Sequence, residues 1–222
     1  MSERLVARPD RIALWAVFLA LFAALAAAAS SAQAGGGSGG IADASEPPPE
    51  GSAECARADF GDRALELGDC GPDVRILNWI LKSKPFERGV GLGKRFDAPT
   101  DATVRAFQGQ VGLASDGVVE DRTRRELKRA MRKDVATWYG PGFWGNRTAC
   151  GVELERNTIG VAHKRLPCGT KVTFAYGGSF VRAKVIDRGP FDHGASWDLT
   201  RASAEKLGFE HTDKLRAAPI KR

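Results

Sequence analysis

Two alternating runs joined by a Gly-Gly pair constrain the fold more than any other feature of this chain. Residues 171–176 (KVTFAY) and 180–186 (FVRAKVI) alternate polar and apolar side chains, which is the pattern of a β-strand with one buried face. Gly177-Gly178 supplies residues that tolerate the backbone of a two-residue hairpin turn. Other short strands and one or two short helices share this region from Asp134 onward, and this pattern predicts a small β-barrel.

A helical pattern precedes the barrel region. Val74, Leu77 and Leu81 fall at positions i, i+3 and i+7, which is the spacing of one helix face. The same spacing predicts a second helix that begins near residues 99–100 and a third that begins near residue 121. The chain is therefore expected to be a multidomain α + β protein, in which a small helical domain precedes the barrel. The predicted boundaries are 54–133 for the helical domain, 134–212 for the barrel and 213–222 for a C-terminal tail.

The N-terminal residues have the pattern of an export signal. Three Arg residues precede an unbroken apolar run over residues 12–29, and Ala32-Gln33-Ala34 follows as a small-x-small cleavage site. Residues 1–34 are therefore predicted to be a signal peptide. The apolar run is also long enough to span a bilayer, so an uncleaved N-terminal anchor is the alternative. Residues 35–53 are rich in Gly, Ser and Pro and predict a flexible linker.

The four cysteines agree with export. An even number of Cys in an exported chain predicts two disulfides, for which three connectivities are possible. Because each near pair lies inside one predicted domain, we expect Cys55–Cys70 and Cys150–Cys168. Neither pair has the C-x-x-C spacing of a zinc site, and the three His are scattered. We therefore expect no metal and no cofactor.

The chain is basic, with a formal net charge of +6. A basic exported protein is attracted to anionic surfaces such as cell-wall polymers, phospholipid headgroups or nucleic acid. The sequence lacks the interleaved aromatic and basic residues of single-strand binders, and export also argues against nucleic acid. Seven of the twelve residues from Arg122 to Lys133 are Lys or Arg. That segment is either a solvated helix face or a contact for a polyanion.

The helical region resembles a known domain family. Residues 66–81 (ELGDCGPDVRILNWIL) and 96–127 (FDAPTDATVRAFQGQVGLASDGVVEDRTRREL) are similar to the three-helix peptidoglycan-binding domain found on many cell-wall enzymes. The most specific part is TxxxVRAFQ followed by GLxxDGVV. This resemblance implies three helices and binding to peptidoglycan. Within the motif, Val104, Phe107 and Leu113 are expected in the core.

The barrel region resembles the RlpA-like (rare lipoprotein A) double-psi β-barrel, a six-stranded fold. Four ordered blocks carry the resemblance: WYGPGF at 138–143, AH with LPCGT at 162–170, DRGPF at 187–191 and DLT at 198–200. Cys150 and Cys168, in TACG and LPCGT, look like a disulfide-bearing subgroup of that family.

The resemblance implies a chemistry for the barrel. RlpA-like proteins include lytic transglycosylases, which cut the glycan strand of peptidoglycan and leave 1,6-anhydromuramic ends. The 6-hydroxyl of muramic acid attacks, so one carboxyl group can first give a proton and later take one back. The family positions imply Asp187 as that acid/base and His163 as its partner. Active relatives carry an acidic residue where this chain has Val152, and Glu153, one position along, is the candidate substitute.

Aromatic and basic residues complete the expected site. Trp138, Tyr139, Trp144 and Arg188 are the candidate substrate-binding residues, and Trp144, in a loop, is expected to be an exposed platform for a sugar ring. The predicted partner is a peptidoglycan glycan strand, and the protein is expected to be an exported monomer. Two alternatives use the same barrel without catalysis: an expansin-like protein that binds or loosens the wall, and a secreted module that binds or inhibits another protein.

Overall fold

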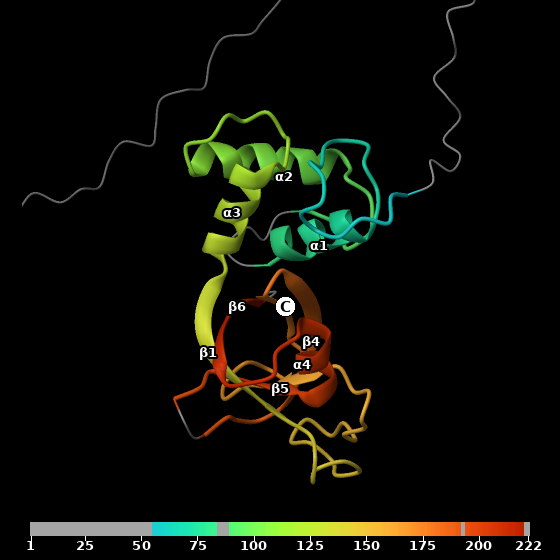
Figure 1. Ribbon diagram of the computed structural model, residues 1–222, viewed down its shortest axis with the longest axis vertical. Coiled ribbons are helices and arrows are strands. Elements are labelled where there is room, and N and C mark those ends of the chain that lie inside the picture. Colours follow the sequence, from blue (N-terminus) through green and yellow to red (C-terminus); the bar gives the residue numbers. More distant parts are fainter. Residues whose placement is uncertain (1–54, 84–88, 192–193, 220–222) are drawn as a thin grey trace, which may run out of the picture. The chain divides into compact units, whose positions relative to one another are not determined.

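The computed structural model describes residues 55–83, 89–191 and 194–219 (Figure 1). The predicted leader (1–34) and linker (35–53) lie outside these residues. In the part of the chain that is described, no helix is both long and apolar enough to cross a membrane.

Three helices form the first domain: α1 (Pro72–Leu81), α2 (Ala98–Gln110) and α3 (Asp121–Ala130). They lie close to the predicted positions. The Asp97 side chain caps α2 by accepting a hydrogen bond of 3.0 Å from the Thr100 N–H, which satisfies one of the free donors at the helix start. The apolar stripes of the helices meet in a buried core that includes Val74, Leu77, Val104, Phe107 and Leu127.

Gln108, in the VRAFQ motif, links α2 to the turn that follows it. Its side-chain oxygen accepts a hydrogen bond from the Gly117 N–H at 2.9 Å, and its Nε2 donates to Asp116 Oδ1 at 2.7 Å. The residue is 1% exposed, so these bonds satisfy a buried amide. The expectation for Leu113 is wrong, because its side chain is only half-buried at the edge of this turn.

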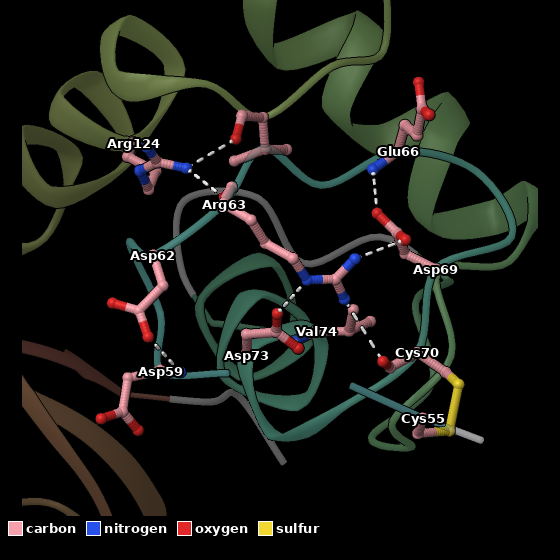
Figure 2. A network of polar contacts seen from close by, with 11 residues as sticks. Cys55, Asp59, Asp62, Arg63, Glu66, Asp69, Cys70, Asp73, Val74 and Arg124 are labelled. Carbon is pink, nitrogen blue, oxygen red and sulfur yellow. Dashed lines mark hydrogen bonds and ion pairs between the residues drawn. A yellow bond between two sulfur atoms is a disulfide. The ribbon is translucent and has the colours of Figure 1, made fainter. Parts of the chain in front are cut away.

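A charged network ties the segment before α1 to the start of that helix (Figure 2). Arg63 Nε donates to Asp73 Oδ2 at 2.8 Å, and its other nitrogens bond Asp69 Oδ1 at 2.6 Å and the Cys70 carbonyl at 3.3 Å. The Asp73 side chain is 1% exposed. Its hydrogen bond is the largest cause of the raised pKa of Arg63.

We expect Asp73→Ala to lower the free energy of unfolding of the helical domain by about 2 kcal/mol, because Arg63 loses its buried charged partner but keeps Asp69 and some solvent. Asp62→Ala is the matched control, since Asp62 is exposed and its side chain accepts a hydrogen bond from the backbone N–H of Asp59. Denaturant unfolding of both variants checks this. Equal losses in the two variants would contradict a special role for Asp73.

Six strands form a closed barrel, in the order β1-β5-β2-β4-β3-β6. The strands are β1 (Arg132–Tyr139), β2 (Gly160–Ala162), β3 (Lys171–Tyr176), β4 (Ser179–Asp187), β5 (Trp197–Thr200) and β6 (Asp213–Pro219). β1 pairs with β5 and β2 with β4 in parallel, and the other four pairings are antiparallel. The predicted β3–β4 hairpin around Gly177-Gly178 is confirmed.

β6 occupies residues that the sequence analysis assigned to a C-terminal tail. It pairs with β1 on one side and with β3 on the other. Without β6 both of these neighbours would have unpaired edges, so closure of the barrel requires it. The tail interpretation overlooked the short apolar alternation around Leu215, which is 1% exposed.

The interior of the barrel is filled by apolar and aromatic side chains. Trp197 and Phe174 pack edge to face with ring centroids 5.2 Å apart. Helix α4 (Arg201–Leu207) follows β5 directly, and Thr200 caps it by accepting from the Ser203 N–H. Figure 1 shows α4 beside β4 and β5. β2 pairs with both β4 and β5, and Ala162 at its end is the register partner of Asp187 on β4 and of Asp198 on β5.

Candidate active site

Asp187 ends β4 and is held by backbone donors. Its Oδ1 accepts hydrogen bonds from the N–H of Ala149 at 2.9 Å and from its own neighbour Arg188 at 2.8 Å. The side chain is half-buried and lines a cavity of about 430 Å³. Two fixed N–H groups therefore orient the carboxylate toward a space that can hold a ligand.

Asp198 on β5 lines the same cavity and is the site residue that the sequence analysis missed. Its Oδ1 accepts a hydrogen bond of 2.7 Å from the Thr137 hydroxyl. Burial raises the pKa of Asp198, and the nearby charge of Asp187 raises it further. The sequence signal for this residue was an acidic side chain inside the apolar strand sequence WDLT. Only the pairing of β5 with its two neighbouring strands brings that side chain beside Asp187.

Tyr139 completes the wall between the two carboxylates. It lies at the end of β1 and lines the 430 Å³ cavity. Burial raises the pKa of its hydroxyl, and the charges of Asp187 and Asp198 act in the same direction. Phe143 packs against its ring at a centroid distance of 6.3 Å.

In the described ranges no group of three or more His, Cys, Asp or Glu side chains could hold a metal ion.

His163 directly follows β2, and among the described residues its ring has no hydrogen bond with the Asp187 carboxylate. Nδ1 accepts hydrogen bonds from the N–H groups of Arg165 and Leu166, both at 3.0 Å, and the ring lies 4.5 Å from that of Trp197. Burial lowers its pKa, and the positive charge of Arg188 adds to this. A neutral His163 therefore shapes its loop, and its backbone N–H reaches the Asp187 carbonyl at 3.2 Å.

Arg188 joins the loops around the site. One guanidinium nitrogen donates to the carbonyls of Leu166 at 2.9 Å and His163 at 3.2 Å, and another contacts Cys168 Sγ at 3.2 Å. These contacts occupy much of the guanidinium group that was predicted to bind substrate.

Both predicted disulfides are present, and Cys150–Cys168 links this loop to the one that contains Ala149.

Glu153 is not brought to the cavity. It is exposed, whereas its neighbour Leu154 is 2% exposed and lines the 430 Å³ cavity. Residues 147 and 153 face each other across an isolated antiparallel bridge. Arg147 lines the cavity, and side chains of a directly opposed pair lie on the same face, so Glu153 lies next to the site without lining the cavity. Val152 is also on the outside, at 37% exposure.

A second cavity of about 450 Å³ adjoins the first, and Arg188 and Asp198 line both. Trp138, Pro190 and Phe191 are among its other lining residues. Each cavity carries one exposed aromatic ring, Phe191 at 76% exposure in this one and Phe143 at 55% in the first. Asp198 therefore lies between two hollows that could each hold a sugar unit, and Asp187 lines the first of them.

An arginine lies over the ring of each of the two tryptophans that were predicted to bind substrate. The Arg156 guanidinium lies 4.4 Å from the ring centroid of Trp144, and Arg201 lies 4.7 Å from that of Trp138. Trp144 is half-buried and lines neither cavity, so the structure does not give it the exposed position that was expected. Trp138 keeps one side on the second cavity and donates from Nε1 to the Glu210 carbonyl at 2.9 Å.

The fold and site define a class: a three-helix domain followed by a closed double-psi β-barrel that has a pair of aspartates on one cavity. Family comparisons agree with this class. Residues 70–127 match the family described as "Putative peptidoglycan binding domain", and residues 133–221 match the family described as "Lytic transglycolase". The chain therefore contains an RlpA-like barrel domain of the lytic transglycolase family, preceded by a domain of the peptidoglycan-binding family.

Curated relatives carry the same barrel. The chain is 43% identical over 141 residues to the "Probable endolytic peptidoglycan transglycosylase RlpA" of Aquifex aeolicus, an alignment that covers 63% of this chain and 58% of the relative. It is 41% identical over 117 residues to the "Endolytic peptidoglycan transglycosylase RlpA" of Neisseria meningitidis serogroup A, covering 50% and 49%. The chain thus spans about half the length of these relatives.

One solved structure with a similar trace is an expansin of Clavibacter michiganensis, described as a D78N mutant in complex with cellohexaose. It is 20% identical to this chain, has a TM-score of 0.34, and the match covers 40% of this chain and 51% of that one.

Proposed function

We propose that this is an exported cell-wall protein that binds peptidoglycan and cleaves its glycan strands as a lytic transglycosylase, leaving 1,6-anhydromuramic ends. The observation that carries the proposal is the pairing of Asp187 and Asp198 on one cavity, with a second cavity directly beside it. Two carboxyl groups in different environments are what acid-catalysed cleavage of a glycosidic bond uses. The names of the relatives support the same reaction.

Asp198 is the proton donor in this mechanism. Burial and the charge of Asp187 raise its pKa, so it holds a proton more readily than an ordinary aspartate. That proton passes to the glycosidic oxygen while the bond from this oxygen to the anomeric carbon breaks. The muramic acid 6-hydroxyl then attacks the same carbon, and its proton returns to the Asp198 carboxylate. No water or cofactor is consumed, and Asp198 ends the cycle protonated as it began.

Asp187 is the electrostatic partner. The N–H groups of Ala149 and Arg188 fix its carboxylate at the edge of the cavity. A preorganised carboxylate stabilises the positive charge that develops at the anomeric carbon in the transition state. From the sequence, Asp187 was predicted to be the group that transfers the proton. The two N–H groups on its Oδ1 and the raised pKa of Asp198 favour the exchanged assignment.

The two cavities support cutting within a strand. A glycan that crosses the Asp187–Asp198 pair would place sugar rings on both sides of the bond to be cleaved, next to Phe143 in one cavity and Phe191 in the other. Exposed aromatic rings stack on the apolar faces of sugars. The helical domain adds a second attachment to the wall, because its family is described by peptidoglycan binding. Cleavage of the glycan strand and attachment to the cell wall both require export of the protein.

The test uses long peptide-free glycan strands and intact sacculi with the full-length wild-type chain. Strands should shorten first to fragments of intermediate length, each with a 1,6-anhydromuramic end detected by mass spectrometry, and the protein should sediment with sacculi. Sedimentation without any anhydro product would contradict the proposed reaction and would instead indicate an expansin-like, non-catalytic wall-binding protein. Products with an ordinary reducing end would indicate hydrolysis.

A further inference from the structure

A groove of about 280 Å³ outside the candidate active site is lined by four cationic side chains. They are Lys128 of α3, Lys133 of β1, and Lys214 and Arg216 of β6. No Asp or Glu is among the residues that line it. Asp213, next to Lys214 in the sequence, accepts hydrogen bonds from the Tyr176 hydroxyl at 3.0 Å and from the Lys214 N–H at 2.6 Å. The groove is therefore an anion-attracting site whose positive charge is only partly balanced.

The pairing of β1 with β6 places like charges opposite each other. Lys133 is the register partner of Arg216. Directly opposed like charges destabilise an antiparallel pair. Arg216 is fixed by donating to the Met131 carbonyl at 3.2 Å, so it does not turn away from the groove freely. A bound anion would relieve this repulsion. Lys171 and Lys184 are likewise opposed on β3 and β4, so the groove is distinguished by its hollow and by the further cations that line it, and not by the repulsion alone.

The positive charge continues from the groove along α3. Arg122, Arg125 and Arg129 lie at i, i+3 and i+7 on the exposed side of the helix, next to Lys128. Of these three, Arg129 pairs with Glu126. The rise of an α-helix makes this row about 10 Å long. A single small anion would fill the groove but leave the row unused, so the surface fits an extended, repeating anion.

We propose that this basic surface, formed by the groove and the α3 row, binds a linear polymer of phosphodiester groups without bases, such as a poly(glycerol phosphate) chain. Lysine ammonium groups bind phosphate as point charges without requiring a fixed orientation. A polymer that bears one charge per repeat can occupy the groove and the row together. This inference is independent of glycan cleavage, because none of these residues lines the two cavities of the candidate active site.

Membranes and nucleic acids fit the surface less well. Among the described residues, none of the exposed large apolar side chains lies on α3, β1 or β6, whereas a membrane-bound helix inserts an apolar face. The aromatic rings beside the groove are already occupied, because Tyr176 packs on Phe209 at 4.9 Å and Lys128 lies 5.6 Å from the Phe180 ring. Bases would find no open ring on which to stack.

The experiment measures binding of fluorescently labelled poly(glycerol phosphate) to the full-length chain between about 50 and 200 mM salt. Contacts to the four groove cations alone predict a slope of log K against log salt of about −3, and contacts to the α3 row make it steeper. Lys133→Gln/Lys214→Gln should weaken binding about tenfold at low salt and reduce the slope by about 1.4. The matched control is Lys171→Gln/Lys184→Gln, which removes the same charge from exposed positions of β3 and β4.

The proposal is supported if only the Lys133/Lys214 variant loses binding and still cleaves glycan as the wild type does. It is overturned if that variant binds like the wild type, or if the control loses as much. Tighter binding of single-stranded DNA of equal charge, or of vesicles rich in anionic lipid, would also overturn it, since these would identify a nucleic acid or a membrane as the partner.

Discussion

Asp198→Asn is expected to reduce the rate of glycan cleavage by about 10²- to 10⁴-fold, the range typical of losing a general acid. Asparagine keeps the hydrogen bond from Thr137 and nearly the same shape, so only the transferable proton is lost. In the wild type, cleavage should fall as pH rises through the raised pKa of Asp198, because the acid is then ionised. The measurement is the rate of anhydro-product release across a pH series. An unchanged rate would remove Asp198 from the chemistry.

The same variant has a stability signature that separates catalysis from folding. The folded-state pKa of Asp198 is raised, so its contribution to stability is fully present below the unfolded pKa of about 3.9 and is lost as pH rises through the folded pKa. Asparagine does not ionise and avoids this loss. Asp198→Asn should therefore be at least as stable as the wild type at neutral pH, with the difference disappearing in acid. A destabilised variant would contradict the burial argument.

Removal of the Cys150–Cys168 disulfide is expected to lower cleavage at least tenfold. Ala149, whose N–H orients the Asp187 carboxylate, is adjacent to Cys150, and Arg188 contacts the other sulfur. Releasing this loop misplaces the carboxylate, and small displacements of reacting groups cost rates of this order. The test is Cys150→Ser/Cys168→Ser, assayed for anhydro products on soluble peptide-free strands.

The second disulfide provides the control. Cys55→Ser/Cys70→Ser removes the bridge of the helical domain and should cost about 3 kcal/mol of stability, as should the barrel bridge. It should leave cleavage of soluble strands unchanged, because the helical domain is not part of the cavities. Equal losses of activity in both double variants would indicate general destabilisation. The assay is run at a temperature at which unfolding curves show both variants to be folded.

Local rules predicted most of the fold. The β3–β4 hairpin follows from alternation around Gly177-Gly178, and α4 follows from the Thr200 cap and the Gly208 that ends it. The disulfide pairs follow from spacing within domains. β6 could not be predicted in the same way, because the need for it arises only when β1 and β3 lack a partner, and that is a property of the closed sheet.

The site was harder to predict because side-chain direction decides it. Asp187 was found from its motif, and its carboxylate does line the cavity. His163 was placed by the same kind of argument, yet its ring bonds loop amides instead of the carboxylate. Asp198 was passed over since its importance depends on β5 lying beside β2, a pairing between segments far apart in sequence. The sequence motifs identify the loops of the site, and the register of the barrel strands determines which side chains lie next to one another.

The most direct test of the central claim compares the wild type with Asp187→Asn on peptide-free glycan strands by mass spectrometry. The account predicts 1,6-anhydromuramic ends from the wild type and none above background from the variant, with both proteins sedimenting equally on sacculi. Equal yields of anhydro products from both proteins would show that Asp187 takes no part in the cleavage and would contradict the account.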